Sequence, residues 1–118
     1  MALINDFYKA NKQKYNIFIV YITEAHAADV WPIGLSSGTI NYKHKTIEDR
    51  LFCVDKMKNE YHIDVPMYAD NMNDIFETEF ASWPFRFYVI KNKKFKMIGQ
   101  PNEAEFDICE LFDFVEKL

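Results

Sequence analysis

The sequence has little of what marks disulfide-rich, metal-binding and nucleic-acid-binding proteins. It holds two cysteines and three glycines in 118 residues, and its 14 basic residues are outnumbered by 18 acidic ones. Cys53 and Cys109 are too distant in sequence for a C-x-x-C pair or a zinc-ligand spacing. The net charge is −4, and the lysines and arginines are scattered along the sequence, so the cluster of basic residues that nucleic-acid binding requires is missing. We therefore expect no metal, no disulfide framework and no nucleic-acid partner.

Long apolar runs and a basic, apolar leader are also missing. The residues after Met1 do not follow a signal-peptide pattern, and the longest apolar run, residues 17–22, is far too short to span a bilayer. No low-complexity tract or Gly/Ser-rich linker interrupts the chain. These absences predict a cytoplasmic protein with no membrane segment in this chain, although an anchor upstream of Met1 stays open. They also predict one domain over residues 1–118.

What the sequence has in quantity is apolar and aromatic side chains. Hydrophobic residues make up 49% of the chain and aromatic residues 17%, against 27% charged residues. This composition supplies enough apolar surface for a packed interior and excludes a disordered chain.

Hydrophobic spacing predicts helix, strand, loop and helix in the first half of the chain. Apolar residues keep helical spacing over 3–8, and the continuous apolar run over 15–22 is typical of a strand buried on both faces. Residues 23–45 contain one proline and two glycines and show no period, which predicts a long loop. Thr46 and Asp49 form a capping-box pattern before a helix that should end near His62.

The second half should add a short strand, a helix, a hairpin and a final capped helix. Residues 65–69 are expected at a sheet edge because Pro66 cannot donate a ladder hydrogen bond. Asp70 is placed to cap a helix, and Asn92-Lys93 to join two antiparallel strands. The alternation predicts an α/β fold, specifically a thioredoxin-like three-layer α/β/α domain that is N-terminally truncated and lacks its first strand. Because that strand is central, its flanking strands should expose unpaired backbone groups.

The segment after the first predicted strand carries the most specific pattern. Residues 21–32 read Y-I-T-E-A-H-A-A-D-V-W-P, which resembles the Y-I-x-E-A-H-x-x-D-G-W segment of the iodothyronine deiodinase family. H-K-T-I-E-D-R at 44–50, D-N-M at 70–72 and R-F-Y-V-I at 86–90 follow in the family's order. The resemblance extends from about Phe7 to Leu118.

The resemblance implies a thioredoxin-fold oxidoreductase that removes iodide from iodothyronines. In the family the nucleophile is a selenocysteine, or a cysteine in some relatives, in a Gly-Ser-x-Thr-(Sec or Cys)-Pro-Pro-like segment after the first strand. This sequence has no such segment, and neither a carboxylate nor an imidazole can replace the selenolate or thiolate. The resemblance therefore implies activity only with an upstream chalcogen. It implies no bound cofactor, with a thiol reductant as co-substrate.

The resemblance also implies which side chains handle protons and substrate. The implied catalytic set is Glu24, His26, His44 and Tyr21, and the implied substrate-binding set is His26, Trp31 and Arg86. On residue type alone Glu24 and His26 form a reasonable acid–base pair, because a histidine titrates near neutrality and a carboxylate can fix its tautomer.

Simpler interpretations stay open beside these. His44 could merely lead into the following helix, and Glu48, Asp49 and Arg50 are most simply exposed charges at a helix start. The two cysteines on apolar helix faces could be small hydrophobic residues. Pro84 could be a cis proline beside the active site or a proline before a turn.

Three kinds of function remain in view. The first is a deiodinase-like oxidoreductase with a small-molecule substrate such as an iodinated phenol. The second is a catalytically inactive thioredoxin-like binding module. The third is a homodimer in which two chains complete each other's sheets through exposed strand edges.

Overall fold

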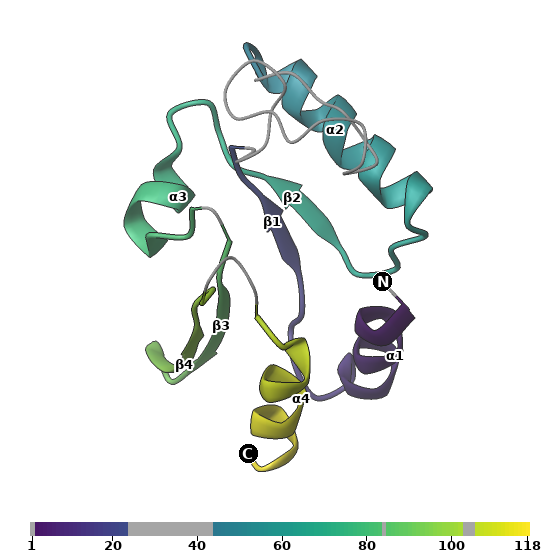
Figure 1. Ribbon diagram of the computed structural model, residues 1–118, viewed down its shortest axis with the longest axis vertical. Coiled ribbons are helices and arrows are strands. Elements are labelled where there is room, and N and C mark those ends of the chain that lie inside the picture. The colour runs from purple at the N-terminus through teal and green to yellow at the C-terminus, as the bar shows by residue number, and fades with distance from the viewer. Residues whose placement is uncertain (1, 24–43, 84, 103–105) are drawn as a thin grey trace. The chain divides into compact units, whose positions relative to one another are not determined.

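The computed structural model describes residues 2–23, 44–83, 85–102 and 106–118 (Figure 1). The chain forms two compact units, Met1–Ala81 and Ser82–Leu118, which we call the N-terminal and C-terminal units. The elements are α1 (Ala2–Asn11), β1 (Ile19–Tyr21), α2 (Ile47–Glu60), β2 (Met67–Ala69), α3 (Ile75–Phe80), β3 (Phe87–Lys91), β4 (Lys94–Gly99) and α4 (Ile108–Glu116). This order confirms the predicted alternation and the α/β class, while the single domain stays a prediction.

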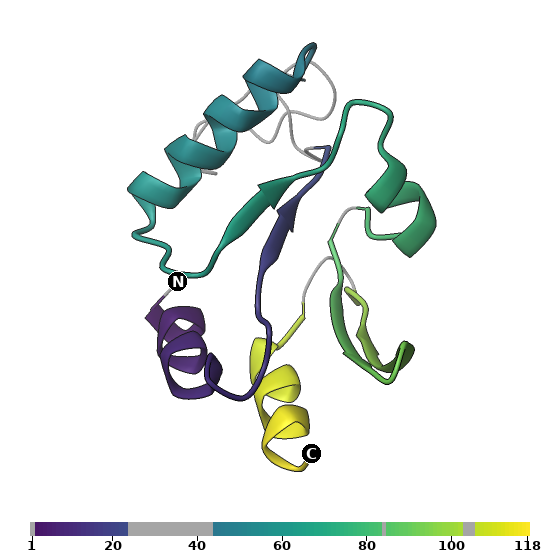
Figure 2. The same cartoon turned by 180° about the vertical axis from the view of Figure 1, so that it is seen from behind.

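The N-terminal unit is built on a parallel pair of strands. Ile19 of β1 lies opposite Met67 of β2, and Tyr21 lies opposite Ala69. Parallel strands need a crossover connection, and α2 lies in that connection and packs beside β2 (Figures 1 and 2). Among the described residues β1 and β2 pair only with each other, which places both at a sheet edge.

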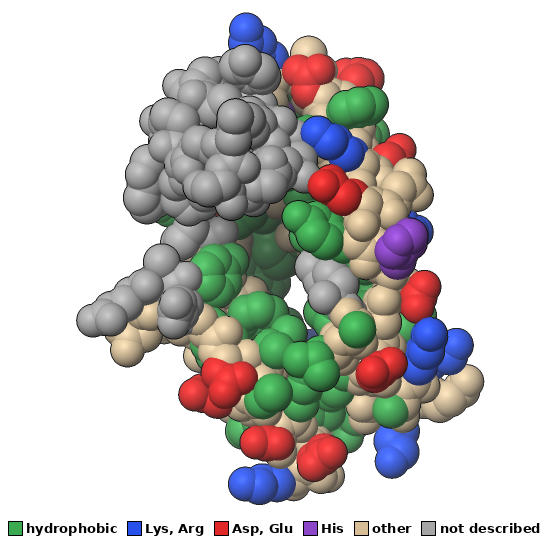
Figure 3. Space-filling view, turned by 45° about the vertical axis from the view of Figure 1, so that its right-hand side comes forward, with side chains coloured by type: hydrophobic (Ala, Val, Ile, Leu, Met, Phe, Trp, Pro, Cys, Tyr) green, Lys and Arg blue, Asp and Glu red, His purple; other side chains and the backbone are tan. Residues whose placement is uncertain are grey.

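The prediction of a strand buried on both faces is wrong. β1 has three residues, all half-buried, and the preceding Phe18 is 56% exposed. No described element buries either face of β1 completely. Other apolar side chains are also exposed, and Figure 3 shows apolar side chains beside charged ones on one face of the molecule.

The predicted capping box at α2 is confirmed. The hydroxyl of Thr46 accepts a hydrogen bond from the backbone N–H of Asp49 at 3.1 Å, and the Asp49 carboxylate accepts one from the backbone N–H of Thr46 at 3.2 Å. The backbone N–H of Lys45 also donates to Asp49, and these bonds hold the pKa of its carboxyl below the ordinary value. The helix ends at Glu60, close to the predicted end.

Asp70 caps α3 as predicted, although it does not occupy the N-cap position. Its buried carboxylate accepts hydrogen bonds from the backbone N–H groups of Asn71, Phe76 and Glu77 at 2.9–3.0 Å. Asp74 stands at the N-cap, and its side chain makes no cap hydrogen bond. The first turn of α3 is therefore satisfied from the end of β2, which leaves the carboxylate of Asp74 available for another partner.

The C-terminal unit contains the predicted hairpin and final helix. β3 and β4 pair antiparallel through Asn92 and Lys93, both with positive φ. The Asp107 side chain caps α4 by accepting from the backbone N–H of Cys109 at 3.0 Å. The rings of Phe87 and Phe106 stack at 4.8 Å within this unit.

Candidate active site

The structure brings together two of the predicted site residues. Tyr21 ends β1, and its ring centroid lies 5.7 Å from that of His44, which precedes α2. Arg86 lies just before β3 in the C-terminal unit. Glu24, His26 and Trp31 lie outside the described residues, as does Pro84. The roles predicted for these residues stay predictions.

His44 is a buried side chain with one nitrogen occupied. It is 6% exposed, and its Nδ1 accepts a hydrogen bond from Nε of Arg50 at 3.1 Å. Its Nε2 is buried and has no hydrogen-bond partner within the part of the chain that the structure describes. A buried polar atom of this kind costs about 1–3 kcal/mol when unpaired, so the Nε2 atom marks a place where a ligand could bind.

Arg50 is the buried residue beside His44 that the sequence interpretation missed. It was expected as an exposed charge, but its side chain is 2% exposed. Its Nη1 donates to the backbone oxygens of Asp70 and Asn71 at 3.1 and 2.9 Å and to Oδ1 of Asp74 at 3.1 Å. Its Nη2 donates to Oγ1 of Thr23 at 3.1 Å. A buried guanidinium needs this many acceptors to offset the loss of water.

A signal for this burial was present in the sequence. The N-terminal end of a helix is its positive end, where carboxylates are favourable and a cation is not. Glu48 and Asp49 follow that rule and are exposed, whereas Arg50 in the same turn violates it. A misplaced cation in a capped first turn indicates a specific anionic or carbonyl partner elsewhere in the fold.

Burial, helped by the neighbouring Arg50 cation, keeps the His44 ring neutral. Burial lowers the pKa of His44 from its ordinary value, and the nearby Arg50 cation lowers it further, while Asp49 and Asp74 oppose this with smaller effects. Asp74 is held by its ion pair with Arg50 and by a hydrogen bond from the Thr23 hydroxyl at 3.1 Å. At neutral pH His44 is thus an uncharged imidazole in a polar, largely dry environment.

The cysteines are poor candidates for a nucleophile. Cys53 is buried in α2 at 8% exposure. Cys109 is exposed, but desolvation and the carboxylates of Asp107 and Asp113 raise the pKa of its thiol, which disfavours the reactive thiolate. Among the described side chains, no group of three or more His, Cys, Asp or Glu residues could hold a metal ion.

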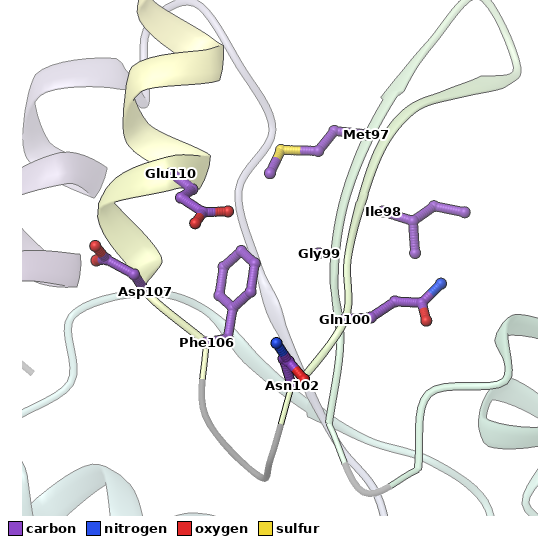
Figure 4. A pocket seen from close by; sticks show the side chains of 8 residues that line it. All are labelled: Met97, Ile98, Gly99, Gln100, Asn102, Phe106, Asp107 and Glu110. Carbon is purple, nitrogen blue, oxygen red and sulfur yellow. The ribbon is translucent and has the colours of Figure 1, made fainter.

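Two of the hollows lined by described residues lie away from His44. One, of about 330 Å³, lies in the C-terminal unit between β4 and the start of α4, where the Phe106 ring is turned toward Gly99 (Figure 4). The other, of about 700 Å³, lies in the N-terminal unit and is lined largely by aromatic residues that include Tyr8, Phe18 and Tyr68. Neither hollow is lined by a predicted site residue. None of the described helices is long and apolar enough to cross a membrane.

Comparison with known proteins identifies the family. The iodothyronine deiodinase family model matches residues 2–118. The type I iodothyronine deiodinase of Xenopus laevis is 28% identical over 115 residues, which cover 98% of this chain and 43% of the relative. The thyroxine 5-deiodinase of Gallus gallus is 28% identical over 102 residues, covering 86% of this chain and 39% of the relative. The chain thus spans about two fifths of the length of these curated relatives. As its sequence pattern predicted, it belongs to the iodothyronine deiodinase family.

Proposed function

We propose that this chain forms the His44-bearing part of a deiodinase-type oxidoreductase that acts on iodothyronines or related iodinated phenols. Family membership supports the reaction class. The observation that carries the proposal is the buried His44, neutral and with an Nε2 that forms no hydrogen bond to a described residue. The site lies at the carboxyl ends of β1 and β2, the usual location of ligand sites on parallel strands.

Replacement of a carbon–iodine bond by a carbon–hydrogen bond needs two electrons and one proton, and it releases iodide. The electrons come from a selenol or thiol, whose oxidised form is then reduced by a thiol co-substrate. The proton or a hydrogen bond comes from a side chain in the site, and His44 is the described residue suited to this role. Since neither Cys53 nor Cys109 is suited to be the nucleophile, we assign the selenium or sulfur atom to a part of the gene product outside this chain.

The proposal includes the remaining residues implied by the resemblance. Glu24 and Tyr21 belong to the proton-handling network with His44, while His26, Trp31 and Arg86 contact the substrate and His26 also handles protons. The fold is thioredoxin-like, no cofactor is bound, and the protein acts as a homodimer. Its cytoplasmic location stays a prediction.

The first test is the nucleotide sequence upstream of Met1. We expect an in-frame Gly-Ser-x-Thr segment followed by TGA or a cysteine codon and then Pro-Pro. The absence of both codons would refute the enzymatic proposal and favour the binding module.

The second test is iodide release by the product of the complete reading frame, supplied with an iodothyronine and dithiothreitol. His44→Asn should lower kcat/KM by about 10²–10⁴-fold, the usual contribution of an acid–base group. His62→Asn is the matched control, because His62 is exposed and has a positive φ that asparagine tolerates. Equal activity in the two variants would exclude His44 from the reaction.

A further inference from the structure

We propose that Arg50 is a positioning residue of this site: it holds the His44 ring through Nδ1 and leaves Nε2–H as the one donor directed at a ligand acceptor. The role in catalysis rests on the proposed function. The arrangement of Arg50 and His44 can be tested on the chain alone, without substrate.

The tautomer of His44 follows from the chemistry of the guanidinium. An arginine side chain is always protonated and can only donate hydrogen bonds. Because Nε of Arg50 lies 3.1 Å from Nδ1 of His44, Nδ1 must supply a lone pair. A neutral ring with a free Nδ1 carries its proton on Nε2. The reverse tautomer would bring two N–H groups head to head in a buried site.

The position of Arg50 is fixed from several elements at once. Thr23 follows β1, Asp70 and Asn71 follow β2, and Asp74 precedes α3, and each accepts from the guanidinium. The forked guanidinium group of Arg50 therefore links the first turn of α2 to the carboxyl ends of both strands. Nε of the same guanidinium holds the His44 ring. The orientation of that ring is therefore fixed relative to the strand ends, which hold the guanidinium.

Stability alone does not account for a cation in this place. Apolar residues of similar volume often replace a buried ion pair without loss of stability, and the first turn of a helix disfavours a positive charge. A lysine could neutralise Asp74 but lacks the rigid, planar donor set that reaches His44 and the strand ends together. A role in orienting His44 explains why a buried arginine occupies this position in the first turn of α2.

Within the described part of the chain, the charged groups that face His44 come from α2 and from the start of α3. Arg50 and Asp49 come from α2 and Asp74 from the start of α3, while β1 contributes the Tyr21 ring. Arg50 is the one cation among them and acts together with burial against protonation of the ring. Loss of the Arg50 charge should therefore raise the pKa of His44, whichever uncharged residue replaces it.

Two variants separate the hydrogen bond from the charge. In Arg50→Gln the side-chain amide nitrogen can occupy the place of Nε and still donate to Nδ1, whereas Arg50→Met keeps the length of the side chain and has no donor. Both variants lose the charge. Thr46→Ala is a control that weakens the start of α2 without removing a group that touches Arg50 or His44.

The measurement is nitrogen-15 NMR of the histidine rings of the purified chain. In the wild type we expect an unprotonated Nδ1 and a protonated Nε2 for His44, and a protected Nε–H for Arg50. Arg50→Gln should keep this tautomer, Arg50→Met should admit the Nδ1–H form, and both should raise the pKa of His44. Thr46→Ala should change neither. A wild-type His44 with its proton on Nδ1 overturns the proposal even if no Arg50 variant folds.

The same variants in the complete gene product link the arrangement to activity. Arg50→Gln should retain a larger kcat/KM than Arg50→Met. In both variants the acidic limb of the pH–rate profile should shift to higher pH. If the tautomer is as proposed but His44→Asn leaves iodide release unchanged, the proposed function fails and the Arg50 arrangement stands. If His44 is required but equal losses occur in Arg50→Gln and Arg50→Met, the positioning role fails and the function stands.

Discussion

The two units of the chain differ in what fills their tightest contacts. Among the described residues of the N-terminal unit the two largest fully buried side chains are Arg50 and Val65, so a guanidinium is buried almost as completely as the most buried apolar side chain. In the C-terminal unit the stacked rings of Phe87 and Phe106 lie against Gly99. A polar cluster depends on every donor meeting its acceptor, while apolar rings can shift and repack. The hydrogen-bonded cluster of the N-terminal unit fixes the orientations of its side chains, and a reactive site requires such fixed orientations.

Removal of the guanidinium should have the largest effect on stability. Arg50→Met removes the charged donor shared by the carboxylate of Asp74 and the carbonyls of Asp70 and Asn71, and leaves Asp74 with the Thr23 hydroxyl alone among its described side-chain donors. We expect a loss of about 3 kcal/mol in the free energy of unfolding, at the lower end for a broken buried pair because Asp74 is partly exposed. Urea titration followed by circular dichroism measures it. A loss below about 1 kcal/mol, as for a surface pair, would contradict the contrast between the units.

A change in the packing of the C-terminal unit at Gly99 should lower the free energy of unfolding by a smaller amount. A Cβ added at Gly99 would lie 2.6 Å from the ring of Phe106 and 3.2 Å from Cβ of Phe87. Gly99→Ala should therefore cost about 1–2 kcal/mol through overpacking. Combining it with Phe106→Leu should recover part of the loss, because the smaller side chain vacates the contact. Full additivity of the two losses in a double-mutant cycle would show that the rings do not press on Gly99.

Elements with local signals could be predicted from the sequence, and contacts between distant segments could not. Thr46 and Asp49 correctly predicted the start of α2, because a capping box involves residues that are three apart in sequence. Asp70 was recognised as a cap, yet its partners Phe76 and Glu77 lie beyond the first turn expected for it. The burial of β1 was misjudged because its apolar run does not reveal which elements cover its two faces.

The candidate site shows the same division. His44 was named from the family pattern, but Arg50, six residues on, was taken as a solvated charge. Its acceptors Thr23 and Asp74 lie 27 and 24 residues away in sequence. No spacing rule links them, because they meet only when β1 and β2 pair and α2 crosses back over them.

A smaller effect should appear in the pH dependence of stability. The pKa of His44 is lowered in the folded chain from an ordinary 6.5. As the pH falls below 6.5, the unfolded chain binds a proton here before the folded chain does, so stability falls down to the folded pKa. The contribution is fully present above 6.5. His44→Asn keeps an acceptor for Arg50 but cannot titrate, so unfolding at about pH 5.5 and about pH 7.5 should differ less than in the wild type. An unchanged difference would mean that His44 is freely protonated in the fold.

The smallest effect should be a gain at the hairpin of the C-terminal unit. Asn92 and Lys93 have φ of 54° and 63°, as a two-residue hairpin turn with the favoured twist requires. Asparagine tolerates this conformation, whereas lysine is strained by its Cβ. Lys93→Gly should relieve that strain and raise the free energy of unfolding by about 0.5 kcal/mol, after the greater entropy of glycine in the unfolded chain is subtracted. Lys94→Gly, one residue on at the start of β4, is the control and should destabilise, since glycine is disfavoured in a strand. If Lys93→Gly also destabilises, side-chain contacts of Lys93 outweigh its backbone strain.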